Sequence, residues 1–422
     1  MKYFYLKIFL LFFSILVELN VYSQTRLAEI VENPEYSGGI YYSYHYSPGL
    51  IVPPPDGYQP FYISHYGRHG SRYHTSEEAY IRPLVMLRKV GKLGKLMPKG
   101  QEVLAKIEAL AMDAHLRYGD LSPRGVQEQR GIAERMVVNY PEIFLTDNDR
   151  KCYIECHSTL VPRCILSMAA FCERIKEFNP AIVTTRYASS RDLDYMANCQ
   201  AMQSLGNEPD RIADSICRTI LRPERLMKTL MTDWKYIDDP QDLMLRLHTL
   251  ASIVQDVNHL GITPFYDIFT NEELYELWKC ENIRRYLQMG PSVRFGDSLI
   301  SDAKPLLRNI IETSQDVIDG KLNLSASFRF GHDSYLMPLL ALLNIKGAAD
   351  RVANLHDLNK HWSVEKVSPM AANIQFIFFR NSHTGEVRVR ILHNEHDVEL
   401  PLSGGPYYPW DKLKNYCESL YQ

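Results

Sequence analysis

Several common patterns are missing from this sequence, and each absence argues against a class of protein. The eight cysteines include no C-x-x-C pair, which argues against a zinc ribbon or a thioredoxin-type redox site. No G-x-S-x-G pentapeptide is present, so the serine nucleophile of an α/β-hydrolase has no sequence support. Internal repeats and low-complexity tracts are also missing. The net charge of only −3 argues against general nucleic-acid binding, although it is compatible with a local basic cleft.

Long hydrophobic runs are confined to the N-terminus. Lys2 and Lys7 flank an apolar run over residues 8–17, which is short for a membrane span, and no second span follows. This pattern predicts a signal peptide over residues 1–23, cleaved after Ser23. We therefore expect an exported protein, periplasmic or extracellular, with no stable membrane insertion after cleavage. In an oxidising compartment some cysteines are expected to form disulfides, although their pairing is open.

The length and the order of the patterns predict an α/β protein with two lobes. A chain of 422 residues is long for a single compact domain. Strand and helix patterns alternate up to about residue 184, helical patterns dominate residues 185–312, and alternation returns over residues 313–422. We therefore expect an α/β domain built from residues 24–184 and 313–422, with a helical cap over residues 185–312 inserted between its two parts.

Two helix starts are predicted from their capping residues. Thr75 and Glu78 form a possible capping box for a helix that begins near Ser76. Ser122 is a good N-cap, and Pro123 suits the first helical position after it.

The loop GRHGSRYH, residues 67–74, carries the most distinctive cluster of side chains. It follows a short β-prone run and precedes a predicted helix, and this arrangement aims backbone N–H groups at a bound anion. Arg68 and Arg72 are planar cations that could hold a tetrahedral oxyanion through several charge-assisted hydrogen bonds. His69 lies between them and could attack a bound phosphorus atom through one ring nitrogen.

Two other interpretations of this loop were weighed. A solvated basic turn is the ordinary explanation for an isolated Arg-His pair. A zinc site formed by His65, His69 and His74 lacks the glutamate and the helix of an H-E-x-x-H site, so we expect no metal.

Three His-Asp pairs occur, and their surroundings distinguish them. His332–Asp333 follows the β-like stretch SFRFG and opens an apolar helix, whereas no such strand precedes His356–Asp357 or His396–Asp397. A pair at the carboxyl end of a strand lies where open α/β sheets bind ligands. We therefore predict that His332 and Asp333 belong to the functional site.

Several segments together resemble the histidine acid phosphatases, which form branch 2 of the histidine phosphatase superfamily. RHGSRYH is similar to their R-H-G-x-R-x-P signature, with His74 in place of the proline. LSPRG (121–125) resembles their leucine–Ser/Thr–x–x–glycine helix, and FRFGHD (328–333) resembles their distal histidine-aspartate motif. HSTLVPRC (157–164) is similar to the segment with the third phosphate-binding arginine, and LHNEHDVELPL (392–402) resembles the closing strand.

The resemblance implies a phosphoglycerate-mutase-like α/β sandwich with an inserted, mainly helical cap. It also implies that His69 is the catalytic nucleophile and that Asp333 is the catalytic proton donor. The phosphate-binding residues would be Arg68, Arg72, Arg163 and His332. No metal and no cofactor is implied, and the expected partner is a small-molecule phosphate ester rather than a nucleic acid.

The substrate is predicted less directly. Arg72–Tyr73 resembles the R-H-G-x-R-Y loop of multiple inositol polyphosphate phosphatases, but that group typically has His-Ala-Glu where this chain has His-Asp-Ser. We expect hydrolysis of inositol polyphosphates such as phytate, with a broad-specificity acid phosphatase as the alternative and a non-catalytic binding module as a third class. Extra phosphates could be held by basic residues of the cap, although a solvated charged face is the more ordinary explanation for them. These residues are Arg211, Arg218, Arg222, Arg225, Lys228, Arg284, Arg285 and Arg294.

Overall fold

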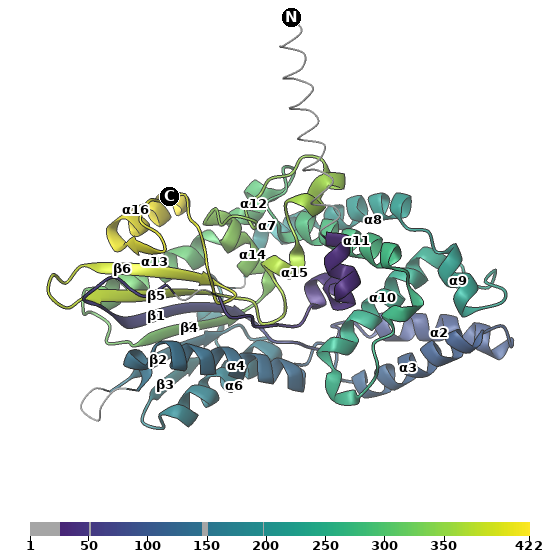
Figure 1. The fold of residues 1–422 in the computed structure, drawn as a ribbon, viewed down its shortest axis with the longest axis horizontal. Coiled ribbons are helices and arrows are strands. Elements are labelled where there is room, and N and C mark those ends of the chain that lie inside the picture. The colour runs from purple at the N-terminus through teal and green to yellow at the C-terminus, as the bar shows by residue number, and fades with distance from the viewer. Residues whose placement is uncertain (1–25, 50–51, 146–150, 197) are drawn as a thin grey trace, which may run out of the picture.

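A computed structural model describes residues 26–49, 52–145, 151–196 and 198–422 of the chain. The predicted signal peptide, residues 1–23, lies outside the described residues. A mixed sheet forms the centre of one lobe, and helices form the other lobe (Figure 1). This is the predicted α/β architecture with a mainly helical cap. No helix among the described residues is long and apolar enough to cross a membrane.

Within the described residues, eight strands form one sheet with the order β3-β2-β4-β1-β5-β6-β7, and β8 pairs with β6. The strands β1 to β4 are parallel, whereas β5 is antiparallel to β1 and to β6. All six residues of β4 are buried, as expected of a strand that is covered on both faces. The strands are β1 (Tyr58–Arg68), β2 (Tyr153–Ser158), β3 (Val183–Tyr187), β4 (Ala326–Gly331), β5 (Asn373–Asn381), β6 (Val387–His393), β7 (His396–Asp397) and β8 (Tyr407–Pro409).

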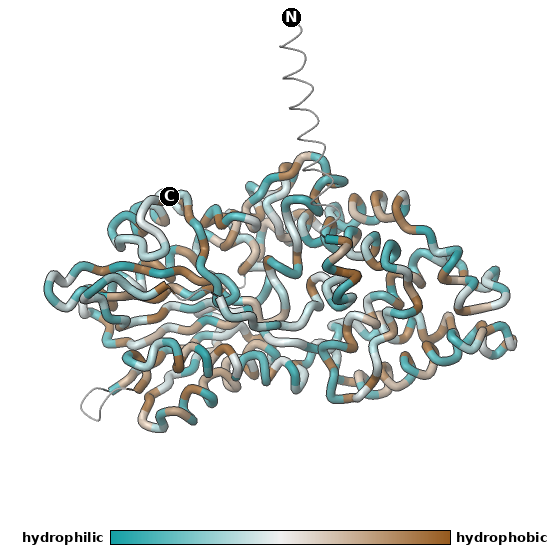
Figure 2. Tube along the Cα trace, in the orientation of Figure 1, coloured by the Kyte–Doolittle hydropathy of each residue, from teal (hydrophilic) through white to brown (hydrophobic). Residues whose placement is uncertain are grey.

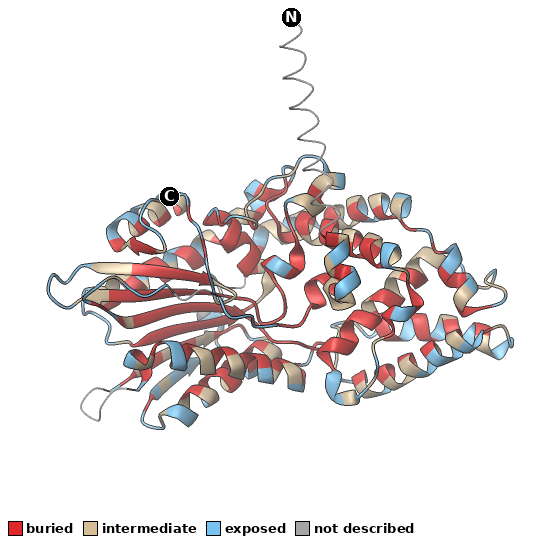
Figure 3. Ribbon diagram, viewed as in Figure 1, coloured by how far each residue is buried: buried red, intermediate tan, exposed pale blue. Residues whose placement is uncertain are grey.

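Two layers of helices cover the sheet, as Figure 1 shows. On one face lie α4 (Pro123–Asn139) and α6 (Pro162–Phe178). On the other face lie α13 (Lys304–Ile318), α14 (Asp333–Leu342) and α16 (Trp410–Tyr421). In Figure 2 hydrophobic and hydrophilic residues alternate along these helices, and in Figure 3 the buried positions concentrate on the central strands and on the inner sides of the helices. The layers therefore enclose a core on each side of the sheet.

The helical lobe contains more of the chain than residues 185–312. Its helices from that segment are α7 (Gln200–Leu205), α8 (Glu208–Ile220), α9 (Glu224–Leu230), α10 (Pro240–Asp256), α11 (Asn271–Met289) and α12 (Gly296–Ser301). Beside them lie α2 (Glu78–Lys92) and α3 (Pro98–Ala114), and the N–H of Met97 donates to the carbonyl of Leu230 (Figure 1). The division of the chain at residues 184 and 312 stays a prediction, and the observed lobe draws α2 and α3 from the first segment.

One of the two predicted helix starts is confirmed. Ser122 caps α4 by accepting the N–H of Gly125, and Pro123 occupies the first turn. The capping box of Thr75 and Glu78 is wrong, because α2 begins at Glu78 and has no side-chain cap. The Ser76 hydroxyl accepts the N–H of Glu78 instead, so a local turn takes the place of the predicted first helical turn.

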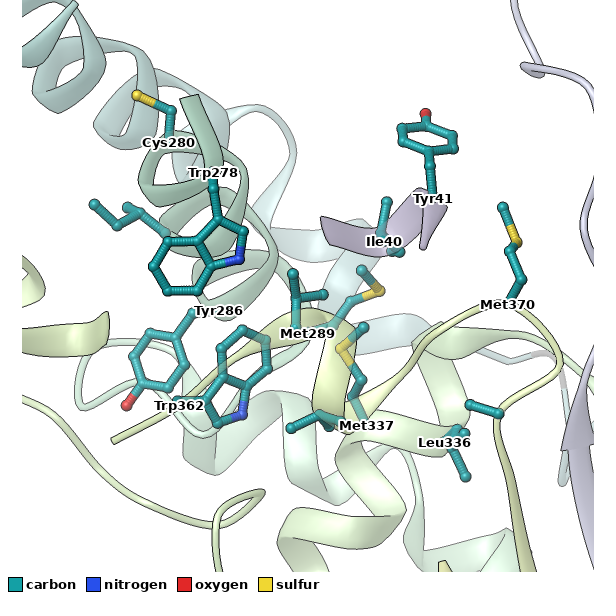
Figure 4. Close-up of a cluster of buried hydrophobic side chains, with 14 of the residues drawn as sticks. Ile40, Tyr41, Trp278, Cys280, Tyr286, Met289, Leu336, Met337, Trp362 and Met370 are labelled. Atoms are coloured by element: carbon teal, nitrogen blue, oxygen red, sulfur yellow. The ribbon is translucent and has the colours of Figure 1, made fainter. Parts of the chain in front are cut away.

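The two lobes share one continuous hydrophobic core. Figure 4 shows part of it, where Trp278 and Tyr286 of α11 lie near Trp362 and near Met337 of α14. The rings of Tyr286 and Trp362 meet edge to face with centroids 5.3 Å apart. All eight cysteines lie within the described residues and are buried, and the expected disulfides are not present among them. The cap is therefore joined to the sheet lobe by packing.

Candidate active site

The candidate site lies where β1 and β4 end. These strands are parallel, and Arg68 at the end of β1 is paired with Gly331 at the end of β4. The loop of residues 67–74, which we call the RHG loop, therefore begins beside His332 and Asp333, which start α14. The rings of His69 and His332 have centroids 5.6 Å apart. The site thus forms at the carboxyl end of neighbouring strands, as predicted.

All six predicted site residues are brought together there. Four of them line one cleft of about 350 Å³: Arg72, Arg163, His332 and Asp333. Arg68 lies behind these lining residues, and its Nη2 is 3.1 Å from Oδ2 of Asp333. His69 is 2% exposed, and its N–H donates to the carbonyl of Gly331.

His69 is held as a neutral imidazole with one free nitrogen. Its Nδ1 lies 2.9 Å from the carbonyl oxygen of Gly70, which can only accept, so Nδ1 carries the proton. Burial lowers the pKa of His69 well below its usual value, and the positive charges of Arg68, Arg163 and Arg72 lower it further. The lone pair on Nε2 is therefore available as a nucleophile.

The three arginines hold donor groups that the protein does not use. Arg68 donates through Nη1 to the carbonyls of Ile40 and Ser368, at 3.0 and 2.9 Å. The Nε atoms of Arg68, Arg72 and Arg163 are all buried and have no hydrogen-bond partner among the described residues. Buried cationic donors without partners are costly, so their grouping indicates a place for an anion. Their planar geometry suits a tetrahedral oxyanion.

The surroundings lower the pKa values of both Asp333 and His332. Burial raises the pKa of Asp333, but the positive charge of Arg68 and its neighbours outweighs this effect and leaves that pKa below its usual value. Burial lowers the pKa of His332 to about 4, with help from the charge of Arg163. The ring of His332 is positioned by Thr159, whose Oγ1 lies 3.2 Å from Nε2. The free site therefore contains an ionised carboxylate and neutral imidazoles at neutral pH.

The helix α4 supports the RHG loop from behind, a role that the sequence did not assign. Ser122 Oγ donates to the carbonyl of Ser71 at 3.0 Å, and Gln129 Nε2 donates to the carbonyl of Arg68 at 2.9 Å. Gly70 and Gly125 pack backbone to backbone, and a Cβ at either one would collide with main-chain atoms. In the sequence, the spacing of Ser122, Gly125 and Gln129 places them on one helix face, and this spacing could have indicated that α4 contacts the loop.

Other support comes from residues that carried no sequence pattern. Ser167 of α6 accepts the N–H of Gly70 at 3.2 Å, and Thr159 contacts His332 as described above. Glu128 of α4 accepts the N–H and the hydroxyl of Ser71, both at 2.7 Å. These contacts join residues that are tens of positions apart, so no local motif indicates them.

The cap contributes one cation to the cleft. Of the eight basic cap residues considered, Arg285 alone lines this cleft within the described part of the chain. Its side chain also donates to Glu281 at 2.6 Å and to Gln288 at 3.0 Å. Several of the others are held by carboxylates elsewhere: Arg218 by Asp239, Arg225 by Glu273, Arg284 by Asp210 and Asp214, and Arg294 by Glu208.

The remaining histidine patterns lie outside the site. His65 is buried among Phe171, Phe328 and Phe330, and His74 accepts the N–H of Ser76 through Nδ1. The described residues contain no group of three or more potential metal-ligating side chains. His356 lies exposed in a 3₁₀ helix, Leu355–Lys360, and the pair His396–Asp397 is exposed in β7.

A neutral histidine among buried arginines, at the strand ends of an α/β sheet, defines a phosphatase site of the histidine type. The chain matches the family profile described as "Histidine phosphatase superfamily (branch 2)" over residues 67–394. The chain therefore belongs to the histidine phosphatase superfamily, branch 2.

Solved structures share this fold at low sequence identity. A multiple inositol polyphosphate phosphatase of Bifidobacterium longum, solved with inositol hexasulfate, is 19% identical with a TM-score of 0.76, and the match covers 89% of this chain and 97% of that chain. The phytase from D. castellii is 16% identical with a TM-score of 0.69, covering 92% of this chain and 85% of that chain. Hafnia alvei phytase is 12% identical with a TM-score of 0.54, covering 88% and 98%.

Proposed function

We propose that this phosphatase hydrolyses phosphomonoesters through a phosphohistidine at His69. The observation that supports this most directly is the neutral His69, with its available Nε2, beside three arginines whose buried Nε atoms have no partner among the described residues. Such a site is complementary to a phosphoryl group whose charge spreads over its equatorial oxygens. A module that only binds phosphate needs neither a nucleophile nor a proton donor.

The first half of the reaction is a displacement at phosphorus. Nε2 of His69 attacks, the P–N bond forms, and the bond from phosphorus to the ester oxygen breaks. The leaving oxygen takes a proton from the carboxyl group of Asp333. The guanidinium groups of Arg68, Arg72 and Arg163, together with His332, hold the phosphoryl oxygens and supply the positive charge that Mg²⁺ supplies in other phosphoryl-transfer sites.

The second half returns the site to its starting state. A water molecule attacks the phosphohistidine and gives a proton to the carboxylate of Asp333, and the P–N bond electrons return to Nε2. Inorganic phosphate then leaves. Because the pKa of Asp333 is depressed by Arg68 in the free site, the proton-donating form is populated on the acid side of neutrality. Bound phosphate adds negative charge between these groups and raises that pKa during turnover.

The substrate we propose is an inositol polyphosphate such as phytate. The cleft volume of about 350 Å³ suits a small molecule, and Arg285 places a cap cation on its wall. A structure of the same fold has inositol hexasulfate, a six-anion ring, in its complex.

A broad-specificity acid phosphatase is the second candidate. Arg225, Arg284 and Arg294 are already paired with carboxylates, so these three cap cations are not free to hold additional phosphates. A substrate with one phosphate needs only the site arginines, so this observation favours sugar phosphates and similar small esters.

Two measurements test the proposal. Release of phosphate from p-nitrophenyl phosphate, together with an acid-labile phosphoryl group on His69 after acid quenching, is expected. Absence of both contradicts the phosphohistidine mechanism. The substrate is then decided by kcat/KM for inositol hexakisphosphate and for a sugar monophosphate at low and high salt. Preference for the polyphosphate with strong salt dependence supports phytate, and preference for the monophosphate supports the second candidate.

We also propose that the protein is exported to the periplasm or the medium after removal of residues 1–23. The charged and apolar pattern of the N-terminus supports this. Mass spectrometry of the mature chain is expected to find Gln24 as the first residue in a cell-free or periplasmic fraction, and an intact Met1 in the cytoplasm contradicts it.

A further inference from the structure

A buried chain of polar side chains connects the RHG loop to the cap. At one end, Glu128 of α4 accepts the N–H and the hydroxyl of Ser71, both at 2.7 Å, and the N–H of Tyr44 at 2.9 Å. Ser71 lies between His69 and Arg72 in the loop. Glu128 therefore anchors the residue on which the spacing of the nucleophile and a phosphate-binding arginine depends.

The chain continues from Ser71 to the last residue of α10. Ser43 Oγ lies 3.3 Å from Ser71 Oγ and 3.0 Å from Oδ1 of Asp256. Asp256 is fully buried, and its Oδ2 has no hydrogen-bond partner among the described residues. The neighbouring Gln255 accepts the N–H of Ser43 at 3.0 Å. The cap helix is thus hydrogen-bonded to the loop through one intervening serine.

Burial and sparse hydrogen bonding decide the state of Asp256. Ser71 donates its hydroxyl proton to Glu128 at 2.7 Å, and Ser43 donates its own to Oδ1 of Asp256 at 3.0 Å. The carboxyl group of Asp256 is fully buried, and its second oxygen has no hydrogen-bond partner among the described residues. Burying an ionised carboxylate with so few hydrogen bonds is costly, so the carboxyl group carries its proton.

The charge belongs at the other end of the chain. Burial raises the pKa of Glu128 as well, but the hydrogen bonds it accepts from Ser71 and Tyr44 and the charge of Arg124, whose Nε lies 3.6 Å away, oppose that rise. Asp256 accepts a hydrogen bond from Ser43, and its Oδ2 has no partner among the described residues. Burial raises the pKa of Asp256 well above its usual value, and the negative charge of Glu128 raises it further.

Other titratable groups near Asp256 do not change this result. Arg68 and Arg72 of the loop face it and favour ionisation, but burial and Glu128 prevail. Tyr80 of α2 and Tyr266, from the short helix Tyr266–Ile268, also face it, and both are neutral because burial raises the pKa of each.

We propose that Asp256 is a positioning residue that is kept as a neutral carboxylic acid and that locks the RHG loop to the cap through Ser43, Ser71 and Glu128. The lock holds His69 and Arg72 in place before substrate binds, so binding energy is not spent on ordering the loop. The proposal goes beyond the phosphatase function and uses turnover only as one readout.

The variants Asp256→Asn, Asp256→Ala and Glu128→Gln test it. An asparagine side chain is neutral, as the protonated acid is, and its amide oxygen accepts from Ser43 in the same way, so Asp256→Asn is expected to keep kcat on p-nitrophenyl phosphate within about threefold. Asp256→Ala removes the acceptor and is expected to lower kcat about tenfold or more with a smaller change in KM. In Glu128→Gln, the amide N–H groups of the glutamine face the donors of Ser71 and Tyr44, with which they cannot form hydrogen bonds. This variant is therefore expected to lower kcat by a similar factor.

Infrared difference spectroscopy reports the proton directly, without any assumption about the substrate. The carbonyl band of a protonated carboxyl is expected in the wild type at about pH 7 and absent in Asp256→Asn. Asp242→Asn is the matched control, since Asp242 begins the same helix but pairs with Arg246 at 2.9 Å, and it is expected to change neither the band nor kcat. An ionised Asp256 in the wild type, or an asparagine variant as impaired as the alanine variant, overturns the proposal. If no phosphatase activity is found, the infrared band still decides it.

Discussion

The arginines of the RHG loop and the arginines of the cap have opposite surroundings. Nε of Arg68 is buried without a partner among the described residues, and the same holds for Arg72 and Arg163. In the cap, by contrast, Arg284 donates to two carboxylates at 2.6 Å, and Arg225 pairs with Glu273. Both sets looked alike in the sequence as runs of positive charge. This difference shows how the two roles can be distinguished. An arginine whose N–H donors lack partners is suited to bind a ligand, whereas an arginine whose donors are hydrogen-bonded to carboxylates has a structural role.

The energetic consequence differs in the same way. An exposed ion pair contributes only about 0–1 kcal/mol, because solvent screens it and the side chains lose freedom. A buried donor without a partner costs about 1–3 kcal/mol until a ligand satisfies it. Phosphate binding therefore removes a free-energy penalty that the unpaired donors of the loop carry. The paired arginines of the cap carry no such penalty, so phosphate would stabilise them less.

His69→Ala is expected to abolish turnover, by roughly ten-thousandfold or more, because no other group in the loop replaces the attacking Nε2. Phosphate binding is expected to change little, since the arginines remain. Steady-state kinetics and calorimetry with inorganic phosphate measure the two effects. Normal turnover by this variant contradicts the assignment of the nucleophile.

Asp333→Asn is expected to slow hydrolysis of alkyl phosphates about a hundredfold to ten-thousandfold, because a poor leaving group needs the proton. p-Nitrophenyl phosphate is expected to lose much less. Arg68 depresses the pKa of Asp333, so the proton-donating form decreases as pH rises and wild-type kcat on alkyl phosphates is expected to fall with it. His69 stays neutral through this range because its own pKa is lowered. The variant is expected to lose this pH dependence, and equal losses on both substrates exclude Asp333 as the acid.

Arg163→Ala is expected to lower kcat/KM about a hundredfold, because it removes unused donors from the phosphoryl oxygens. The inhibition constant of inorganic phosphate is expected to rise as well. Arg163→Lys keeps the charge and is the control for geometry; a full recovery by lysine shows that charge alone matters and weakens the argument from planar donors.

Arg285→Ala is expected to have an intermediate effect that depends on the substrate. This residue lines the cleft but also pairs with Glu281, so it is the one cap arginine that combines both kinds of surroundings. KM for inositol hexakisphosphate is expected to rise about tenfold, while kinetics on p-nitrophenyl phosphate change little. Equal changes for both substrates show that Arg285 does not distinguish additional phosphates.

Arg225→Ala is expected to leave kcat/KM within about twofold and to lower the free energy of unfolding by less than about 1 kcal/mol. Its donors go to Glu273 and to the carbonyl of Ile268, on the surface of the helical lobe. Activity assays and chemical denaturation measure this. A loss of activity as large as that of Arg163→Ala breaks the comparison between the two sets of arginines.

Much of the site was predictable because its parts are contiguous in the chain. The RHG loop and the His332–Asp333 pair each follow a strand directly, and parallel strands end at the same edge of a sheet. The Ser122 cap was predictable for the same reason, since the capping contact spans three residues. The predicted Thr75 cap failed because Ser76 offered a competing local hydrogen bond.

The α/β class, the six candidate site residues and the edge of the sheet where they lie were all predictable from the sequence alone, because strand and helix periodicity and short motifs depend on near neighbours. Only the tertiary structure decided which arginines are left without partners, that α2 and α3 lie in the helical lobe, and that Glu128 and Asp256 reach the loop through Ser71 and Ser43. Those outcomes depend on contacts between residues that are tens or hundreds of positions apart. Each carboxylate of the cap could have paired with several cations, and packing selected one arrangement.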